Sequence, residues 1–588
     1  MKLSIFFFMA MFFGRIAFTE EILVQDSSSE LFNTAEIVIG SEIIQNKNAQ
    51  DFYSLINRGL FIESNSFNFI SGESSLSFFG QGANRFLVEI DGLPQTSATG
   101  IGGARDLSYI DPFMFDDVAL VFGGQGAMLG GQAFSGAIQL KRQESNETRY
   151  QLMIGNYGQQ KIAFKNGKKN NWGIFGYSFG HRQKSGPSLS QTPRPENNLL
   201  ENDQRQIDSV DLWWRPKNSV GFEIELKGFL SKQDFDQPQL DDDRPKSEEK
   251  QLELIIKNTG LLFGDKVASE IISRYQYNRR SIQTVYQEKE YPISYGNNSL
   301  YFQQQFQLLE PIGRFRSLMV GTQFNRDFIL EISEMAEEEK IKLDNIQGNI
   351  FLKGEWEKST ENKINFSLRT NLFSQATFPQ LSIGHVYNVG KNINKITFTR
   401  NHRPASNYER FSIYGNKILA DELSHGVELE HLYPLKNNQK IKFIALYQQQ
   451  ENLILFDQEE LKYRNLQSNT ISSFGGEYYF SLGSFNNYIG LRYAKNSDKM
   501  FQRFFSPIKL IWDLEKQINN KSSVKINQQI YSPKSNYFGE KIEASYLSSL
   551  NYSYNLSPKL VFNAYGSFSF IKSDMENQLI ELSLKGIL

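Results

Sequence analysis

From about residue 143 to residue 588 the sequence alternates apolar and polar residues, the pattern of strands whose two faces meet different surroundings. The clearest example sets Phe222, Ile224 and Leu226 against Glu223, Glu225 and Lys227. The alternation recurs at 172–180, 300–308, 363–369 and 580–588. At roughly 20 residues per strand and connection, a segment of this length predicts about 22 strands.

A soluble two-sheet sandwich would also alternate in this way, but a sandwich of this size normally divides into domains. The polar rows carry charges of both signs, which suits a water-filled lumen better than a dry core. A closed barrel of about 22 strands holds a plugged lumen. We therefore expect residues 143–588 to form one antiparallel transmembrane β-barrel, with the apolar residues of 222–227 facing lipid and the charged ones facing the lumen.

Composition narrows the class of protein further. Mean hydropathy is -0.44, yet 14% of the residues are aromatic, as expected where only alternate side chains meet lipid. The chain has no cysteine, which excludes disulfides and thiolate chemistry. A net charge of -2 gives no basic surface for nucleic acid.

The first 19 residues have the order of a secretory signal peptide. Lys2 supplies the positive charge, Leu3 to Phe13 form an apolar run, and Ala17 begins a small-residue cleavage region. Arg15 interrupts the run well before the about 20 residues that a membrane helix needs. Residues 1–19 are therefore predicted to direct export.

Residues 34–142 differ from the rest, because they mix glycine-rich turns and short apolar strands with a helical segment at 46–60. In that segment Phe52, Leu55 and Ile56 share one face, and Gly59 lies near its end. An Asp-Gly turn and three further glycines, all suited to positive φ, punctuate the strands: Asp91, Gly92, Gly123, Gly130 and Gly136. These features predict a small α/β domain.

The segments FLVEIDGLP (86–94) and ARDLSYIDPFMFDDVALVFGGQGAMLGGQAFSGAIQLK (104–141) resemble, in order, the plug of the TonB-dependent receptors. Residues 402–430 and 465–480 resemble barrel segments of the same family. The resemblance implies a plug inside the lumen of a monomeric outer-membrane barrel, with TonB as periplasmic partner. Size and spacing are nearest to the vitamin B12 (cobalamin) branch.

Residues 20–33 are expected to hold the TonB box and a linker. The box-like residues are Glu21, Ile22, Leu23, Val24 and Gln25. Such a box adds as an extended strand to the edge of a partner sheet, where backbone hydrogen bonds supply the affinity. The chain has no GxxxxGK[ST] phosphate-binding loop, so the energy for transport would arrive through this contact.

Two positions depart from the family pattern, because Phe79 and Phe122 stand where plug arginines usually precede glycines. We expect both rings to be buried against the barrel wall on neighbouring plug strands. The barrel acids Glu422, Glu428 and Glu477 would then lack a plug arginine, and would lie in water or pair with barrel cations.

Candidate solute contacts lie on two plug loops, 64–71 and 95–103, whose tips are expected to face outward. They are Asn65, Asn68, Ser71, Gln95, Thr96, Ser97, Thr99 and Ile101, with Tyr109 nearby. A run rich in oxygen ligands offers a possible structural calcium site, although a hydrated surface loop is the simpler interpretation: Asp234, Asp236, Asp241, Asp242 and Asp243. No other cofactor is expected.

The sequence gives no support for catalysis. The five histidines have no metal-binding spacing, and the GYSFG segment around Ser178 lies in an alternating strand rather than in a strand-to-helix turn. The resemblance implies TonB-dependent import of a large scarce solute, such as cobalamin or a siderophore. The alternative is a surface receptor or adhesin of the same fold that no longer imports, raised by the loss of both plug arginines.

Overall fold

The structure is a computed structural model, and the residues that it describes fall into 21 segments. They are 36–39, 52–57, 59–64, 76–97, 107–124, 126–142, 148–187, 202–217, 221–234, 246–286, 289–333, 339–372, 379–412, 414–436, 439–457, 460–466, 468–498, 505–535, 541–557, 559–571 and 574–587.

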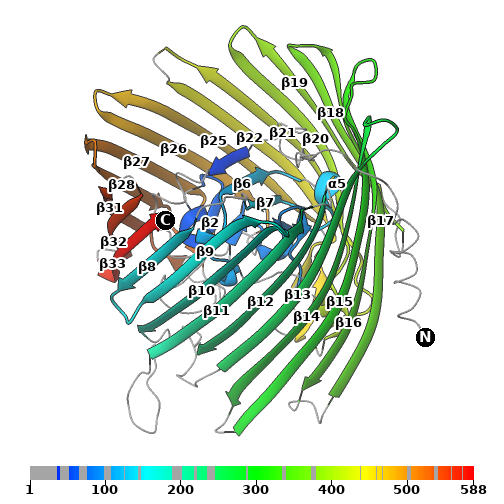
Figure 1. The fold of residues 1–588 in the computed structure, drawn as a ribbon, viewed down its shortest axis with the longest axis horizontal. Coiled ribbons are helices and arrows are strands. Elements are labelled where there is room, and N and C mark those ends of the chain that lie inside the picture. The colour runs from blue at the N-terminus through cyan, green and yellow to red at the C-terminus, as the bar shows by residue number, and fades with distance from the viewer. Residues whose placement is uncertain are drawn as a thin grey trace.

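Within these segments, 22 antiparallel strands close into one barrel (Figure 1). The strands are β8 (Arg149–Gly155), β9 (Gln160–Asn170), β10 (Gly173–Pro187), β11 (Asn202–Pro216), β12 (Phe222–Asp234), β13 (Lys246–Leu262), β14 (Val267–Tyr286), β15 (Lys289–Leu308), β16 (Phe315–Ser333), β17 (Glu339–Ser359), β18 (Asn362–Asn371), β19 (Gln380–Val389), β20 (Asn392–Arg403), β21 (Glu422–Pro434), β22 (Lys440–Glu451), β25 (Ser468–Leu482), β26 (Phe485–Asn496), β27 (Ile508–Asn519), β28 (Ser522–Tyr531), β31 (Ser545–Ser557), β32 (Leu560–Ile571) and β33 (Asp574–Ile587). The last strand closes the ring by pairing with the first, β33 with β8. The expected barrel is confirmed.

The period-two pattern separates the two faces of the wall as predicted. Leu226 is 37% exposed on the outer face, beside its cross-strand neighbour Leu254. Glu225, the adjacent residue, is 1% exposed and forms an ion pair inside the barrel with Arg142. Alternation along a strand is therefore enough to place lipid-facing and lumen-facing side chains.

The two rims of the barrel differ in the length of their connections. At one rim the connections are short, and the longest of them covers 309–314. At the other rim they include 188–201, 235–245, 404–421 and 452–467. We call this second end the long-connection rim. It carries one described helix, α6 (Asn407–Phe411), and two small hairpins, β23 (Ile454–Asp457) with β24 (Lys462–Asn465) and β29 (Lys534–Ser535) with β30 (Lys541–Ile542).

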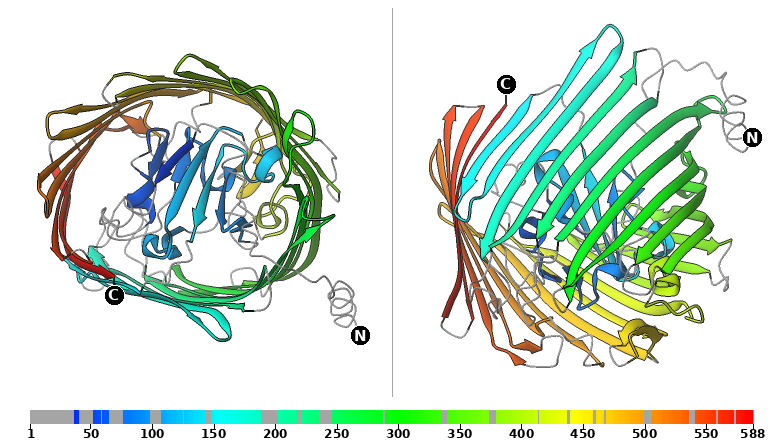
Figure 2. Two further views of the ribbon diagram at one scale, coloured as in Figure 1. Left: turned by 45° about the horizontal axis from the view of Figure 1, so that its top comes forward. Right: turned by 90° about the horizontal axis from the view of Figure 1, so that it is seen from below.

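Residues 36–141 form a second unit inside the ring, which we call the plug (Figure 2, left). Its five-stranded sheet has the order β1-β6-β7-β4-β5, and β2 pairs with β3. The elements are β1 (Glu36–Ile39), α4 (Phe52–Ile56), β2 (Ile62–Ser64), β3 (Leu76–Phe78), η1 (Ala83–Arg85), β4 (Phe86–Ile90), β5 (Leu93–Pro94), η3 (Leu107–Tyr109), η4 (Pro112–Met114), β6 (Asp117–Phe122), α5 (Gly126–Leu129) and β7 (Gly136–Lys141). The helices of the described residues are all too short or too polar to span a bilayer. Phe52, Leu55 and Ile56 lie in α4 and are buried, so the expected helix is present over fewer residues.

Phe79 and Phe122 belong to an aromatic cluster in the plug. Both are buried, with ring centroids 6.1 Å apart, and Phe61 lies between 5 and 6 Å from each. The cluster continues into apolar residues of the barrel wall, including Ile444 and Ile471. The burial is as expected and stabilises each ring by about 1.5–3 kcal/mol. The expected placement on neighbouring strands is wrong, because Phe79 follows β3 and Phe122 ends β6 of the other sheet.

The expectation that the barrel acids lack a plug arginine is wrong for Glu422. Arg85 of the plug donates to Glu422 across 2.6 Å, and Arg403 of the barrel donates to the same carboxylate across 2.6 Å. Arg403 also holds Glu409 of α6 through two hydrogen bonds of 3.1 and 3.0 Å. All four side chains are buried. Arg85 therefore ties the plug to the wall from a position other than those of Phe79 and Phe122.

The other two acids are also buried rather than in water. Glu428 is 5% exposed on β21. Glu477 is 2% exposed and accepts hydrogen bonds from the hydroxyl groups of Tyr488, across 3.0 Å, and Tyr479, across 3.4 Å. The two tyrosine hydroxyl groups supply donors to the buried Glu477 carboxylate, where water or a cation was expected.

A second tie joins β2 of the plug to another part of the wall, near β27 and β28. Glu63 accepts hydrogen bonds from Lys534, across 2.9 Å, and from the backbone and side chain of Ser506, both across 3.0 Å. Lys509 donates to three plug carbonyl groups, at Asn57, Gly59 and Ile62. Burial alone would raise the pKa of Glu63, but Lys534 and Arg492 outweigh it and hold the pKa below its ordinary value.

Substituting a lipid-facing residue tests the orientation of the strands. Leu226→Arg should lower the free energy of unfolding in lipid by about 2–4 kcal/mol, because the cation enters the hydrocarbon region. Lys227→Arg, on the adjacent lumen-facing position, should change it by less than about 0.5 kcal/mol. Reversible urea unfolding in lipid vesicles measures both, and equal losses would contradict the assignment of faces.

Removing the charge of Glu422 tests the tie between plug and wall. Glu422→Gln leaves two buried guanidinium groups without their shared carboxylate, which should destabilise the plug by about 3–5 kcal/mol. Hydrogen exchange of the β4 backbone amides measures this as faster opening. The matched control is Glu430→Gln on the same strand, where the partly exposed pair with Lys442 should contribute no more than about 1 kcal/mol. Equal exchange in the two variants would refute the tie.

Candidate functional site

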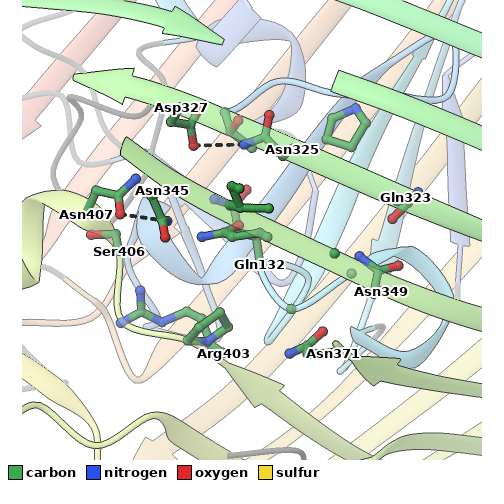
Figure 3. Close-up of a pocket in the computed structure, with 18 of the residues that line it drawn as sticks. Gln132, Gln323, Asn325, Asp327, Asn345, Asn349, Asn371, Arg403, Ser406 and Asn407 are labelled. Carbon is green, nitrogen blue, oxygen red and sulfur yellow. Dashed lines mark hydrogen bonds between the residues drawn. The ribbon is translucent and has the colours of Figure 1, made fainter. Parts of the chain in front are cut away.

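A pocket of about 400 Å³ lies between the plug and the barrel wall at the long-connection rim (Figure 3). The plug contributes Leu87, Pro94, Thr96, Ser97, Leu129, Gly130, Gly131 and Gln132. The barrel contributes Arg274, Tyr301, Gln323, Phe324, Asn325, Asp327, Asn345, Ile346, Gln347, Gly348, Asn349, Asn371, Arg403, Pro404, Ala405, Ser406, Asn407, Arg410, Phe411 and Asp421. Its volume is in the range of small-molecule sites, about 300–1,000 Å³.

A tight turn brings the first plug segment to the pocket. Asp91 and Gly92 have φ of 50° and 77°, which reverses the chain between β4 and β5. The Asp91 carboxylate accepts a hydrogen bond from the backbone of Arg142 across 3.0 Å, so the turn is tied to the end of the plug. On the barrel side, Arg274 donates to the carbonyl oxygen of Pro94 across 2.7 Å. Residues 94–97 are thereby held against the wall.

The second plug segment follows the short helix α5, which packs against the barrel. Asn401 accepts a hydrogen bond from the Gly126 backbone across 2.9 Å. The chain then turns at Gly130, where φ is 127°. At Gly131 a Cβ atom would lie 2.7 Å from the carbonyl oxygen of His402, so only glycine allows this approach. Gln132 projects from this turn into the pocket (Figure 3).

The outer wall of the pocket is the connection 404–421 with its helix α6. Ser406 caps the helix in a capping box with Glu409, which fixes the first turn. Arg410 donates to Asp421 across 2.7 Å. Burial alone would raise the pKa of Asp421, but hydrogen bonds and charge from His402 and Arg410 hold the pKa below its ordinary value.

The predicted solute contacts divide into four groups. Thr96 and Ser97 line the pocket. Gln95 is buried and turns its amide back to the carbonyl oxygen of Leu93, 3.1 Å away. Tyr109 stacks on Phe229 and donates to Glu249 across 2.7 Å, against another part of the wall. The remaining candidates lie outside the described residues: Asn65, Asn68, Ser71, Thr99 and Ile101.

The other predicted sites lie largely outside the described residues. These are the TonB box, Glu21 to Gln25, and four calcium candidates, Asp236, Asp241, Asp242 and Asp243. Asp234 ends β12. In the described part of the chain, no group of three or more His, Cys, Asp or Glu side chains is arranged to hold a metal ion. Ser178 is buried in β10, without the turn that a nucleophile would need.

The prediction placed solute contacts on the plug and did not include the barrel half of the pocket. That half had a signal in the sequence, because alternate positions of β16 and β17 carry carboxamides: Gln323, Asn325, Asn345, Gln347 and Asn349.

Comparison with known proteins gives a family match for the plug and a structural match for the whole fold. Residues 32–137 match the family of the TonB-dependent Receptor Plug Domain. No curated protein matches the chain by sequence. The siderophore receptor PirA from Acinetobacter baumannii superposes with a TM-score of 0.77 at 12% identity, covering 96% of this chain and 100% of that one.

Two further solved structures have the same fold. The ferric enterobactin receptor PfeA from Pseudomonas aeruginosa, a mutant bound to enterobactin, has a TM-score of 0.77 at 11% identity, with 94% and 99% of the two chains covered. The copper transporter OprC has a TM-score of 0.76 at 12% identity, with 94% and 98% covered. Residues 32–137 thus carry a TonB-dependent receptor plug, and the chain as a whole has the TonB-dependent receptor fold.

Proposed function

We propose that this chain is a TonB-coupled importer that takes a scarce, large solute across the outer membrane. The observation that carries the proposal is the pocket, because plug and barrel build it jointly at the long-connection rim. Outer-membrane barrels have short periplasmic turns and longer extracellular loops, so the proposal places the long-connection rim at the cell surface. A solute bound there touches both the part that must move and the part that stays in the membrane.

The route across the barrel requires movement of the plug. The plug sheet occupies the lumen (Figure 2, left), and the buried contacts of Arg85 and Glu63 tie it to the wall. Residues 21–25 are the proposed handle, since a strand added to the edge of a TonB domain transmits force through backbone hydrogen bonds. Export through the signal peptide at 1–19 and action as a monomer belong to the same proposal.

The proposal assigns transport to the chain and no catalysis. A siderophore or cobalamin was expected as the solute, and the related folds include receptors whose names state siderophores and copper. At 11–12% identity these folds do not carry their ligands over to this chain. The solute is better argued from the pocket itself.

The alternative, a surface receptor or adhesin that no longer imports, was raised by the two missing arginines. Arg85 ties the plug to Glu422 from another position, so the substitutions at Phe79 and Phe122 do not by themselves imply a plug without an ionic hold. Import therefore remains the proposal. The calcium candidates around Asp234 stay a prediction.

A proline in the TonB box tests the coupling. Leu23→Pro removes one backbone donor and fixes φ, so it should abolish uptake while solute binding to cells stays unchanged. Ser28→Pro, outside the box, is the matched control and should import normally. Growth on the limiting nutrient and uptake of labelled solute measure the effect. Unchanged uptake in Leu23→Pro would reject coupling through this segment and favour the receptor alternative.

A further inference from the structure

The barrel half of the pocket is a ladder of carboxamides on two neighbouring strands. In the register of β16 and β17, Gln323 lies opposite Asn349, Asn325 opposite Gln347, and Asp327 opposite Asn345. Cross-strand partners and alternate residues share a face, so all six side chains point into the lumen. We call these six residues, five carboxamides and the carboxylate of Asp327, the amide ladder. Figure 3 shows five of them around the cavity, at labelled positions on adjacent strands.

Further carboxamides extend the amide ladder on every side. Asn345 donates to Asn407 of α6 across 2.9 Å, and Asn371 lies opposite Asn349 on β18. The plug adds Gln132 from the other side of the cavity. Of the 28 described residues that line the pocket, eight are therefore asparagine or glutamine. Barrel, rim helix and plug all present the same functional group.

The arginines of the lining are already engaged with carboxylates or with the backbone, and the Asp327 carboxylate accepts a hydrogen bond from Asn325 across 2.8 Å. Arg403 is held by Glu409 and Glu422, and Arg410 by Asp421. Arg274 donates to the backbone at Pro94, with its guanidinium 5.2 Å from the ring centroid of Tyr301. Among the described residues that line the pocket there is no lysine, glutamate, histidine, cysteine or methionine.

This chemistry discriminates between classes of solute. Each carboxamide carries two donors and an acceptor oxygen with two lone pairs. Part of this capacity is used within the protein, since Gln323 and Asn349 accept hydrogen bonds from Arg369 across 2.6 and 2.5 Å. The donors and lone pairs that remain match hydroxyl groups, which both donate and accept. An anionic iron chelate would lose its hydration without gaining a free guanidinium or ammonium partner, which is costly. A soft metal ion would need thiolate, thioether or imidazole ligands.

We propose that the pocket recognises a neutral, polyhydroxylated solute, of the oligosaccharide class, through the amide ladder. The inference rests on the proposed function, since it assigns a solute class to the import site. The volume of about 400 Å³ accepts part of a chain of sugars at a time. Specificity comes from the two-way hydrogen bonding of the carboxamides, and the engaged arginines leave an anionic competitor without a cationic partner.

Calorimetry on the purified full-length protein in detergent tests the solute class. The neutral probes are maltohexaose, cellopentaose, xylohexaose and chitohexaose, and the charged comparison is ferric enterobactin. At least one neutral probe should bind more tightly than ferric enterobactin. Its affinity should change by less than about twofold between about 50 and 500 mM NaCl, because no ion pair is formed.

Two variants place the binding on the amide ladder. Gln347→Leu should weaken the neutral probe about tenfold, since a hydroxyl group loses its partner in the bound state. Asn325→Leu, its cross-strand partner, should do the same. Gln347 is exposed to the lumen, so its replacement leaves folding intact even if Asn325→Leu does not fold. Gln307→Leu is the matched control, a partly exposed glutamine on the inner face of β15 that does not line the pocket.

Three results would overturn the inference: failure of every neutral probe to bind, tighter binding of ferric enterobactin, or equal affinity in Gln347→Leu and Gln307→Leu. The outcome is separable from that of the proposed function, because binding to the purified protein does not require TonB. A protein that binds a sugar but imports it equally well with Leu23→Pro keeps the solute class and loses the coupling. Tight binding of ferric enterobactin, together with uptake that is lost in Leu23→Pro, would keep the coupling to TonB and reject the solute class.

Discussion

The closure of β33 on β8 is the contact on which the rest of the structure depends. A chain that crosses hydrocarbon must pair every backbone donor and acceptor within itself, and an open sheet would leave two edges unpaired. The register Leu584 opposite Leu152 joins the last strand to the first, more than four hundred residues away in sequence. Once the ring is closed, its outer face is committed to lipid and all recognition moves to the lumen and the rims.

Closure also decides how the plug is held. The lumen is lined by polar side chains, so apolar packing alone cannot secure a domain there, and the plug uses charged contacts at separate points of the wall. Arg85 joins Glu422 on one side, and Glu63 joins Lys534 and Ser506 on another. Between them an aromatic cluster around Phe61, Phe79 and Phe122 continues into the wall.

The sequence predicted the wall well, because alternation is a local property. Glu225 and Leu226 fall on the faces that their positions dictate, and the exposure of Ile580 to Ser583 on β33 alternates in the same way. It predicted the plug core less well. Phe122 was expected beside Phe79 on a neighbouring strand, yet the two rings come from different sheets. The tie from Arg85 to Glu422 was missed, because it joins residues 337 positions apart and no local pattern records it. The carboxamides of β16 and β17 were visible as a polar face, but their convergence with Gln132 and α6 appears only in three dimensions.

Arg403 belongs at once to the pocket lining and to the buried group that ties down the plug. Its neighbours in the pocket do not share this double membership: Gln347 is exposed to the lumen and lies at a distance from Glu422 along the ring of strands. The two kinds of position therefore differ in how freely they can vary over evolutionary time. Replacing Asn345 or Gln347 would change the chemistry of the pocket without loosening the plug. Replacing Arg403 would change both the pocket and the buried contact that holds the plug. The pocket therefore combines positions that are free to vary with a position that the attachment of the plug constrains.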